Sequence, residues 1–279
     1  MAAQSLFATL FPSDCRLCGA ALTEVSRLPV CSVCVESIHR IEAPTCAVCG
    51  ELIAGAATGA ETRCGLCQRV RMPFAQAVAY GSYDGALRGL IHLLKYDRVR
   101  PAGGVLGRML AEAMAELKFA SAEKAPLVVP VPLSAGRERQ RGFNQAEEIA
   151  RAALRHWRKG GRQGESASTV AGETPTVPEL NTSALERIRE TQSQTGLTRH
   201  QRRANLRGAF VAAWPVELAG RQVVLVDDVY TTGTTVYECA RVLRRAGAAE
   251  IYVATAARVL KGEAAGAAEH AVATVRAEA

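Results

Sequence analysis

One segment restricts the possible folds of this chain more than any other. It runs from Val223 to Thr235 with the sequence VVLVDDVYTTGTT, in which an apolar run is followed by two carboxylates and a hydroxyl-rich glycine loop. Continuous apolar residues of β-branched type are typical of a parallel strand that is covered on both faces. The apolar spacing from Val236 to Ala246 predicts a helix directly afterwards. The segment therefore indicates an α/β fold with a loop between strand and helix.

The loop predicts a site for a phosphate group. Free backbone N–H groups and the positive end of the helix dipole favour an anion at this position, and Gly233 allows the backbone a close approach. Four threonines add hydroxyl donors around the same point, namely Thr231, Thr232, Thr234 and Thr235. We expect a monophosphate to fit here.

The acid pair Asp227 and Asp228 indicates what the phosphate is attached to. Two carboxylates would repel a phosphorylated ligand unless it also offers hydroxyl groups or a metal ion. A ribose phosphate offers both, since carboxylates accept hydrogen bonds from vicinal hydroxyls and Mg²⁺ prefers one or two carboxylates with substrate oxygens. The alternative is an ordinary strand-to-helix turn capped by Asp and Thr. We interpret the segment as a ribose-phosphate site.

Cysteines form the second strong pattern, because eight of the nine lie in the first quarter of the chain as C-x-x-C pairs. The pairs are Cys15/Cys18, Cys31/Cys34, Cys46/Cys49 and Cys64/Cys67. Each pair places two thiolates on a tight knuckle, and the intervals allow two knuckles to meet around one tetrahedral ion. We predict two structural Zn²⁺ sites with four thiolates each. Consecutive pairing would give two tandem ribbons, and an interleaved cross-brace is the alternative.

Disulfides, an iron–sulfur cluster and a thiol redox centre are the competing interpretations of these cysteines. A reducing cytosol disfavours disulfides. Cysteines that bind clusters more often come as closely spaced triplets or with a trailing proline, although four paired thiolates could hold iron. For the ninth cysteine, Cys239, we expect the role of a small buried apolar side chain.

The net charge of the cysteine-rich region indicates what kind of partner this region can bind. Residues 1–72 contain six arginines and no lysine against one aspartate and five glutamates, so their formal charge is zero. Two zinc ions with four thiolates each would make it about −4. Nucleic-acid backbones are bound through Lys and Arg, so direct nucleic-acid binding by this region stays uncertain and a structural or protein-docking role is favoured. The net charge of +7 comes from the remainder of the chain.

Length and composition predict one full domain and a smaller one, since the chain has 279 residues of which 48% are hydrophobic. No apolar run is long enough to cross a bilayer, and the first residues lack a secretory pattern. We therefore expect a cytoplasmic protein with no membrane partner. The expected division is a double zinc ribbon over 1–72, a second domain over 73–257 and a C-terminal tail over 258–279.

The pattern after residue 75 predicts alternating strands and helices. Strands are expected at 75–82, 127–131, 177–180, 208–213 and 250–256, and helices at 85–95, 104–117, from about 145 to 157, and at 199–206. This order predicts a doubly wound parallel sheet, which binds ligands at the carboxyl ends of its strands. The loops 133–144, 186–207 and 227–235 would then surround one crevice. Residues 160–179 indicate a disordered insertion.

The chain resembles the ComF family (competence protein F, GntX), whose phosphoribosyltransferase domain is of type I. The resemblance rests on the C-x-x-C pairs, HLLKY at 92–96, VPVPL at 129–133, RGFNQ at 141–145, SQTGL at 193–197, RANLRGAF at 203–210 and the segment from Asp227 to Thr235. Outside the last of these, the order of the motifs is more specific than any single motif. The resemblance covers most of the chain from residue 15 to about 257.

The resemblance implies a protein that binds 5-phosphoribosyl-1-pyrophosphate (PRPP) with Mg²⁺. Thr231 to Thr235 would hold the 5-phosphate, and Asp227 and Asp228 the ribose hydroxyls as the catalytic pair. Lys95 and Arg141 would face the pyrophosphate, and residues 186–203 would form a flexible hood. The implied reaction is transfer of the phosphoribosyl group to an unidentified acceptor. The alternative is a non-catalytic PRPP sensor in DNA uptake that docks partners through its ribbons.

Overall fold

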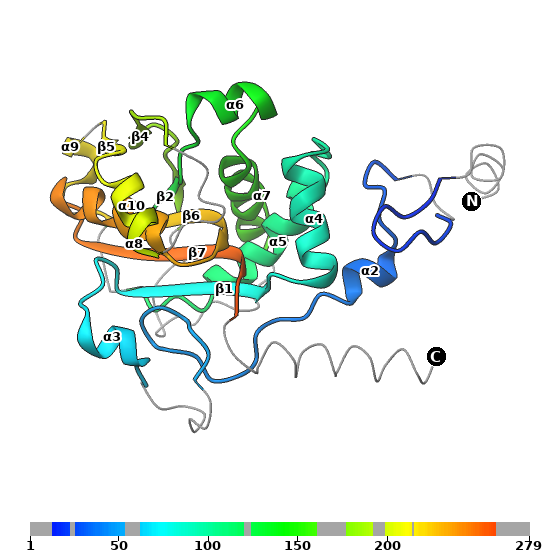
Figure 1. Ribbon diagram of the computed structural model, residues 1–279, viewed down its shortest axis with the longest axis horizontal. Helices are drawn as coiled ribbons and strands as arrows, with labels where there is room; N and C mark the ends of the chain where they lie inside the picture. The colour runs from blue at the N-terminus through cyan, green and yellow to red at the C-terminus, as the bar shows by residue number, and fades with distance from the viewer. Residues whose placement is uncertain are drawn as a thin grey trace.

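Five apolar runs of the sequence form a parallel sheet at the centre of the protein (Figure 1). The computed structural model describes residues 13–22, 26–53, 62–119, 124–160, 177–191, 199–213 and 215–260. The strand order is β1-β7-β6-β2-β3, and all four neighbouring pairs are parallel. These strands are β1 (Gln76–Ser82), β2 (Leu127–Pro130), β3 (Glu179–Leu180), β6 (Gln222–Tyr230) and β7 (Glu250–Arg258). The strands predicted from the apolar runs are confirmed.

Helices cover both faces of the sheet, as the prediction of a doubly wound fold requires (Figure 1). One face packs against α4 (Gly85–Lys95), α5 (Ala102–Met114) and α7 (Gln145–Gly160). The other face packs against α8 (Arg199–Leu206) and α10 (Thr234–Arg245). Burial on both sides explains the unbroken apolar run from Val223 to Val226, each residue of which is fully buried.

The remaining elements are short. They are α2 (Ser32–Glu36), α3 (Gly65–Arg69), α6 (Ala135–Arg141), α9 (Pro215–Leu218) and an antiparallel pair, β4 (Leu185–Arg187) with β5 (Phe210–Ala212). Two of them differ from the prediction. Residues 135–141 form a helix where a loop was expected, and β4 lies in a stretch for which the sequence predicts only a polar segment.

The two cysteine-rich units pack on different parts of the core. The first ribbon, which carries Cys15 to Cys34, joins the core around α4 and α5, and the second ribbon, which carries Cys46 to Cys67, joins the core around α10. The edge strand β1 is bonded by the linker between the two ribbons and by the second ribbon. Ile41 N–H, in the linker, donates to the Tyr80 carbonyl at 2.9 Å, and Ala77 N–H donates at 2.8 Å to the carbonyl of Val48, between Cys46 and Cys49. These bonds cover part of an edge that would otherwise be free to pair with other chains.

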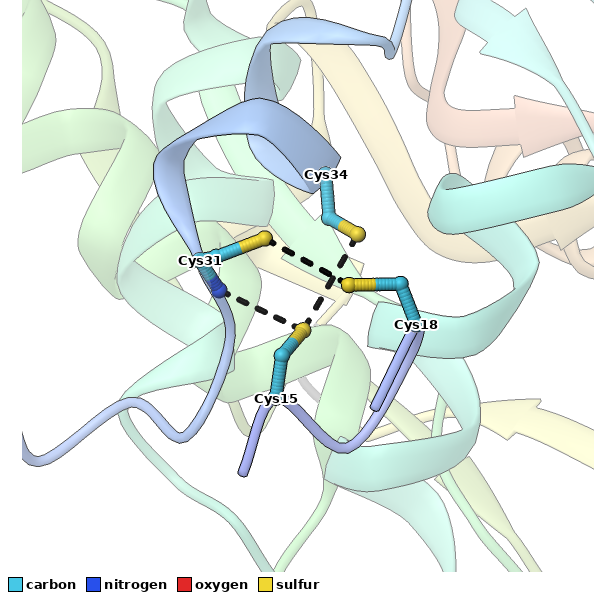
Figure 2. Close-up of side chains that lie close together, drawn as sticks. All are labelled: Cys15, Cys18, Cys31 and Cys34. Carbon is cyan, nitrogen blue, oxygen red and sulfur yellow. Dashed lines mark hydrogen bonds between the residues drawn. The ribbon is translucent and has the colours of Figure 1, made fainter. Parts of the chain in front are cut away.

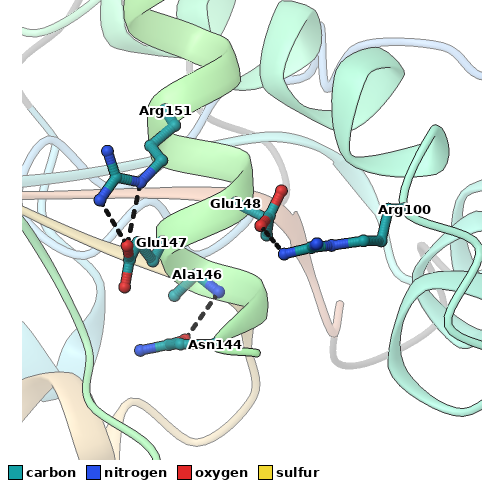
Figure 3. A network of polar contacts seen from close by, with 6 residues as sticks. All are labelled: Arg100, Asn144, Ala146, Glu147, Glu148 and Arg151. Atoms are coloured by element: carbon teal, nitrogen blue, oxygen red, sulfur yellow. Dashed lines mark hydrogen bonds and ion pairs between the residues drawn. The ribbon is translucent and has the colours of Figure 1, made fainter. Parts of the chain in front are cut away.

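Asn144 connects the sheet to α7, whose first turn it caps (Figure 3). Its Oδ1 accepts a hydrogen bond of 3.0 Å from Ala146 N–H, and its Nδ2 donates to the Val131 carbonyl, also at 3.0 Å. Beyond the cap, Glu148 pairs with Arg100, which fixes the start of α7 against the turn that precedes α5. The end of β2 and the start of α7 are therefore held together by one side chain.

Several predicted segments fall outside the described residues. They are most of the insertion 160–179, most of the tail 258–279, and the SQTGL motif at 193–197 within the predicted hood. Their structure stays a prediction. Where the predicted tail begins, β7 continues to Arg258, two residues beyond the expected end of that strand.

The packing of α5 on α7 provides a test of the fold. A Cβ atom added to Gly107 would lie 2.3 Å from Ala152 Cβ and 2.8 Å from Ala153 N, so the helices meet backbone to backbone there. We expect Gly107→Ala to reduce the free energy of unfolding by about 1–3 kcal/mol. A Cβ atom added to Gly104 on the same helix would have no atom within 4 Å, and Gly104→Ala should stabilise the protein by about 0.5–1 kcal/mol. Urea unfolding of both variants measures this, and equal effects would contradict the packing.

Candidate functional site

Lys95 and Asp228 meet in an ion pair at the carboxyl end of β6. Lys95 is the last residue of α4, and its Nζ lies 2.6 Å from Asp228 Oδ2. Both side chains are mostly buried, with 14% of the lysine and 7% of the aspartate exposed. Asp227 Oδ1 accepts a hydrogen bond of 2.9 Å from the backbone N–H of Asp228. Two side chains that the sequence analysis assigned to different parts of one ligand are therefore in direct contact.

The acid pair is part of the strand and does not follow it. The sequence predicts that the strand ends at Val226, but β6 continues to Tyr230 because Asp227 pairs with Thr255 and Val229 with Ala257 of β7. This difference matters for the site. Backbone hydrogen bonds of the sheet hold both carboxylates, and rigid elements position functional groups better than loops do.

Burial and the neighbouring charges change the pKa of Asp227 and that of Lys95. Burial, together with the negative charge of Asp228, raises the pKa of Asp227 to about 7, and the positive charge of Lys95 only partly offsets this. Burial alone would lower the pKa of Lys95, but the charge and hydrogen bond of Asp228 outweigh it and raise that pKa above its ordinary value. Near neutral pH the lysine is therefore charged, while Asp227 is protonated in part of the molecules.

The threonine loop has the shape expected of an anion site. Gly233 has a φ of 71°, in the left-handed region, and immediately precedes α10. The hydroxyls of Thr232 and Thr234 lie 2.9 Å apart. A Cβ atom at Gly233 would lie 2.3 Å from the hydroxyl of Tyr230, so only glycine fits above this tyrosine. The loop thus stands at the amino end of a 12-residue helix, where free N–H groups favour an anion.

Arg187 is a functional candidate that the sequence analysis did not single out. It ends β4, its guanidinium lies 5.5 Å from the centre of the Phe210 ring, and it donates a hydrogen bond to Thr191. Its buried Nε has no hydrogen-bond partner within the described part of the chain. Burial and the charge of Arg137 lower the pKa of Arg187, whereas Asp227 raises it. Arg187 is therefore within electrostatic reach of the acid pair, although in the sequence it is one arginine among several.

Arg141 lies on the lysine side of the site. Its Nη1 donates to Gln145 Oε1 at 2.7 Å, and its guanidinium lies 5.6 Å from the centre of the Tyr96 ring. Tyr96 follows Lys95 directly, and its side chain is 65% exposed. Within the described residues these contacts do not include the acid pair, so the structure brings Arg141 near Lys95 through Tyr96 alone.

The eight paired cysteines form two clusters of four, and Figure 2 shows the first of them. The first contains Cys15, Cys18, Cys31 and Cys34, and the second contains Cys46, Cys49, Cys64 and Cys67. Within each cluster all Sγ atoms lie within 4.8 Å of one another. The knuckles therefore pair consecutively, which is one of the two arrangements that the sequence left open, and the interleaved cross-brace is excluded.

The clusters fit zinc. Four thiolates at ~2.3 Å from a tetrahedral ion lie about 3.8 Å apart, and the measured Sγ–Sγ distances include 3.9 Å for Cys15–Cys34 and 3.7 Å for Cys18–Cys31. Burial opposes ionisation of Cys15, but backbone N–H donors, that of Cys31 first among them, lower the pKa of Cys15 to about 6. In the second cluster, backbone donors likewise outweigh burial and lower the pKa of Cys46 to about 7. Burial and the neighbouring cysteines raise the pKa of Cys34, Cys49 and Cys67 instead, so one thiol in each cluster ionises first. A thiolate is the form that binds a metal.

Both the cysteine-rich part of the chain and the part that contains the sheet are similar to known proteins. The family model of the double zinc ribbon domain matches residues 6–71, and that of the phosphoribosyl transferase domain matches residues 109–271. DNA utilization protein YhgH of Escherichia coli is 32% identical over 250 residues, which are 89% of this chain and 98% of that protein. Competence protein F of Haemophilus influenzae is 31% identical over 231 residues, which are 82% of this chain and 90% of that protein. The chain belongs to the ComF family.

Similarity to solved structures is more distant. Glutamine PRPP amidotransferase from B. subtilis, complexed with ADP and GMP, is 26% identical with a TM-score of 0.30, and the match covers 56% of this chain and 26% of that chain. The family models and the two relatives, and not this structural match, confirm the family, the double ribbon and the phosphoribosyltransferase domain of this ComF protein. The roles of its individual site residues stay predictions.

Among the helices described, none combines the length and the apolar character that a membrane span requires.

The cysteine clusters predict a zinc content of two equivalents per chain. Elemental analysis of the purified protein measures it directly. Cys46→Ser removes one of four ligands from the second cluster and should lower the content to about one equivalent. Cys239→Ala is the matched control, because Cys239 is fully buried in α10 and belongs to neither cluster. Bound iron with a brown chromophore would contradict the assignment.

The raised pKa of Asp227 predicts that stability decreases as the pH rises. An aspartate in the unfolded chain titrates near 3.9, whereas Asp227 in the folded protein titrates at about 7. Between these values the folded protein holds a proton that the unfolded chain has released, so the free energy of unfolding falls with rising pH. Asp227→Asn removes this titration. Denaturant unfolding should show the variant gaining stability over the unmodified protein from about pH 4 to pH 7, and a constant difference would contradict the shift.

Proposed function

We propose that this ComF protein binds PRPP at the carboxyl end of β6. The observation that carries the proposal is the Lys95–Asp228 ion pair of 2.6 Å beside a glycine loop that opens α10. A ligand for this place must satisfy an anion-binding loop, a pair of carboxylates and a buried lysine at once. A sugar that carries a phosphate at one end, free hydroxyls in the middle and a pyrophosphate at the other end meets these three requirements.

Each group of side chains has its own role in this proposal. Thr231 to Thr235 hold the 5-phosphate, and Asp227 and Asp228 accept hydrogen bonds from the ribose hydroxyls. Lys95 turns from the carboxylate towards the pyrophosphate oxygens. Arg187 joins it from β4, because a half-buried guanidinium with an open Nε is suited to bind an anion. Arg141 is the third cation, and it approaches from the side of Tyr96.

Mg²⁺ would neutralise charge on the pyrophosphate, and the acid pair offers the carboxylate oxygens that this ion prefers.

The reaction we propose is a displacement at C1 of the ribose. The bond from C1 to the pyrophosphate oxygen breaks, and its electron pair leaves with the pyrophosphate. An acceptor atom forms the new bond to C1 and releases its proton to the solvent. Lys95 and the arginines stabilise the charge that develops on the leaving group, while the loop and the acid pair hold the ribose in place. The acceptor is unidentified.

A second candidate is a PRPP sensor without turnover. Relatives named DNA utilization protein and competence protein F favour a role connected with the uptake or use of DNA. In that role PRPP binding would report on the metabolic state of the cell, and the ribbons would dock a protein partner. Both candidates use the same site in a cytoplasmic protein, so binding and turnover must be measured separately.

Binding is tested by calorimetry with PRPP and Mg²⁺. Asp228→Asn should weaken PRPP binding about 10-fold or more, because a charged acceptor for hydroxyl groups is lost and Lys95 is left without its partner. Glu250→Gln is the matched control. It removes the same unit of charge from the amino end of β7, at the opposite end of the strands from the site, and should bind PRPP normally. An unmodified protein that shows no PRPP binding would contradict the proposal.

Turnover is tested with isotopically labelled PRPP and a panel of nucleobases. Pyrophosphate release that depends on one base and disappears in Asp228→Asn supports the transferase. Saturable binding of PRPP without release on any acceptor supports the sensor.

A further inference from the structure

Arg258 is the largest of the almost completely buried side chains in the described part of the chain, with 1% of its surface exposed. A buried guanidinium is costly unless its charge is paired and its donors are bonded. Arg258 ends β7, next to Tyr230 in β6 and Ser82 in β1. Arg258 is thus a buried charge at the end of a largely apolar strand, and its burial must be explained by its polar partners.

The partners of Arg258 come from the second ribbon. Its Nη1 donates to the backbone carbonyl of Cys49 at 2.7 Å, and its Nη2 lies 3.3 Å from Glu51 Oε2. Both acceptors belong to the knuckle that opens the second cysteine cluster. The approach is close, since a Cβ atom at Gly50 would lie 2.7 Å from Arg258 Nη1. The second ribbon therefore supplies a charge and an acceptor for the two terminal nitrogens, while the buried Nε has no hydrogen-bond partner within the described residues.

The other side of the guanidinium faces the phosphate loop. It lies 4.9 Å from the centre of the Tyr230 ring, at the distance of a cation–π contact. The hydroxyl of Tyr230 in turn lies against the backbone of Gly233, where even a Cβ atom would not fit. Tyr230 thus contacts both Arg258 and the loop that opens α10.

A second contact joins the same two parts. Met72 and Phe74, in the segment that leaves the second ribbon, line a narrow pocket together with Tyr230, Gly233 and Tyr237. The first ribbon has different contacts. Leu17 packs on Gly89 of α4, and Arg16 pairs with Asp97 at 3.5 Å. Of the two ribbons, only the second contacts residues next to the phosphate loop within the described part of the chain.

We propose that Arg258 is a positioning residue that makes the phosphate loop depend on the folded second ribbon. The knuckle at Cys49 and Glu51 holds the guanidinium, the guanidinium holds the Tyr230 ring, and the ring supports Gly233. The inference rests on the proposed function in that Thr231 to Thr235 bind a phosphate. It goes further by giving the second ribbon a defined task in that binding.

Arg258→Met tests the proposal in the full chain, because methionine retains much of the volume but removes the charge and both donors. Calorimetry should show a loss of about 10-fold in affinity for ribose 5-phosphate, while affinity for inorganic pyrophosphate, bound on the Lys95 side, is unchanged. Arg258→Lys should recover part of the loss because it keeps a cation over the ring. Unchanged affinity for ribose 5-phosphate in Arg258→Met would overturn the proposal.

Amide hydrogen exchange provides a measurement that needs no ligand. Exchange at residues 231–235 should be faster in Arg258→Met and in Cys46→Ser, and the double variant should exchange no faster than either. Cys15→Ser, in the first cluster, is the matched control and should leave the loop unchanged. If both cysteine variants accelerate the loop equally, the effect is general destabilisation and the proposal is wrong.

The two measurements also separate this inference from the proposed function. If the unmodified protein binds neither PRPP nor ribose 5-phosphate, the proposed function fails, yet faster exchange of the loop in Arg258→Met still supports the positioning role. If the unmodified protein binds both ligands and Arg258→Met changes neither affinity nor exchange, only the positioning role fails.

Discussion

The parallel pairing of β6 with β7 is the interaction on which the rest of the structure depends. It holds Asp227 of the acid pair beside Thr255 and Tyr230 beside Arg258. A slip of one residue would turn every side chain of β6 to the opposite face of the sheet. The apolar run before Asp227 is buried on both faces, so the core holds this part of the strand firmly. The candidate site is therefore built on the most buried part of the molecule.

The contact of Lys95 with Asp228 has a cost that stability alone does not explain. Two buried charges lose their hydration, and an apolar pair of similar volume is often as stable or more stable. Removal of one partner, in contrast, leaves an uncompensated charge and costs about 3–5 kcal/mol. A lysine and an aspartate in this position, with Asp227 held near its neutral form by the same surroundings, are what a site for a charged ligand requires. A ligand that binds both side chains can replace the ion pair without leaving either charge unpaired.

The two ribbons support different parts of this site. The first packs on α4, the helix that ends at Lys95, and the second holds Arg258 below the phosphate loop. The chain between them pairs with β1 and covers part of the sheet edge. Zinc in these positions fixes short segments that have little core of their own. Each ribbon therefore packs against the domain that contains the sheet, the first through α4 and the second through β1 and Arg258.

The sequence by itself determined the cysteine knuckles, the buried strand before Asp227 and the glycine loop after it, because these depend on residues that are neighbours in the chain. It also indicated the doubly wound sheet from the order of apolar runs. It missed α6 and β4, whose polar residues carry no apolar period, and it ended β6 too early, since only pairing with β7 extends the strand past the carboxylates. The tertiary structure alone decided that the cysteines pair consecutively, that Lys95 meets Asp228, and that Arg187 and Arg258 approach the site. Those contacts join segments far apart in the chain, and strand order and register bring them together.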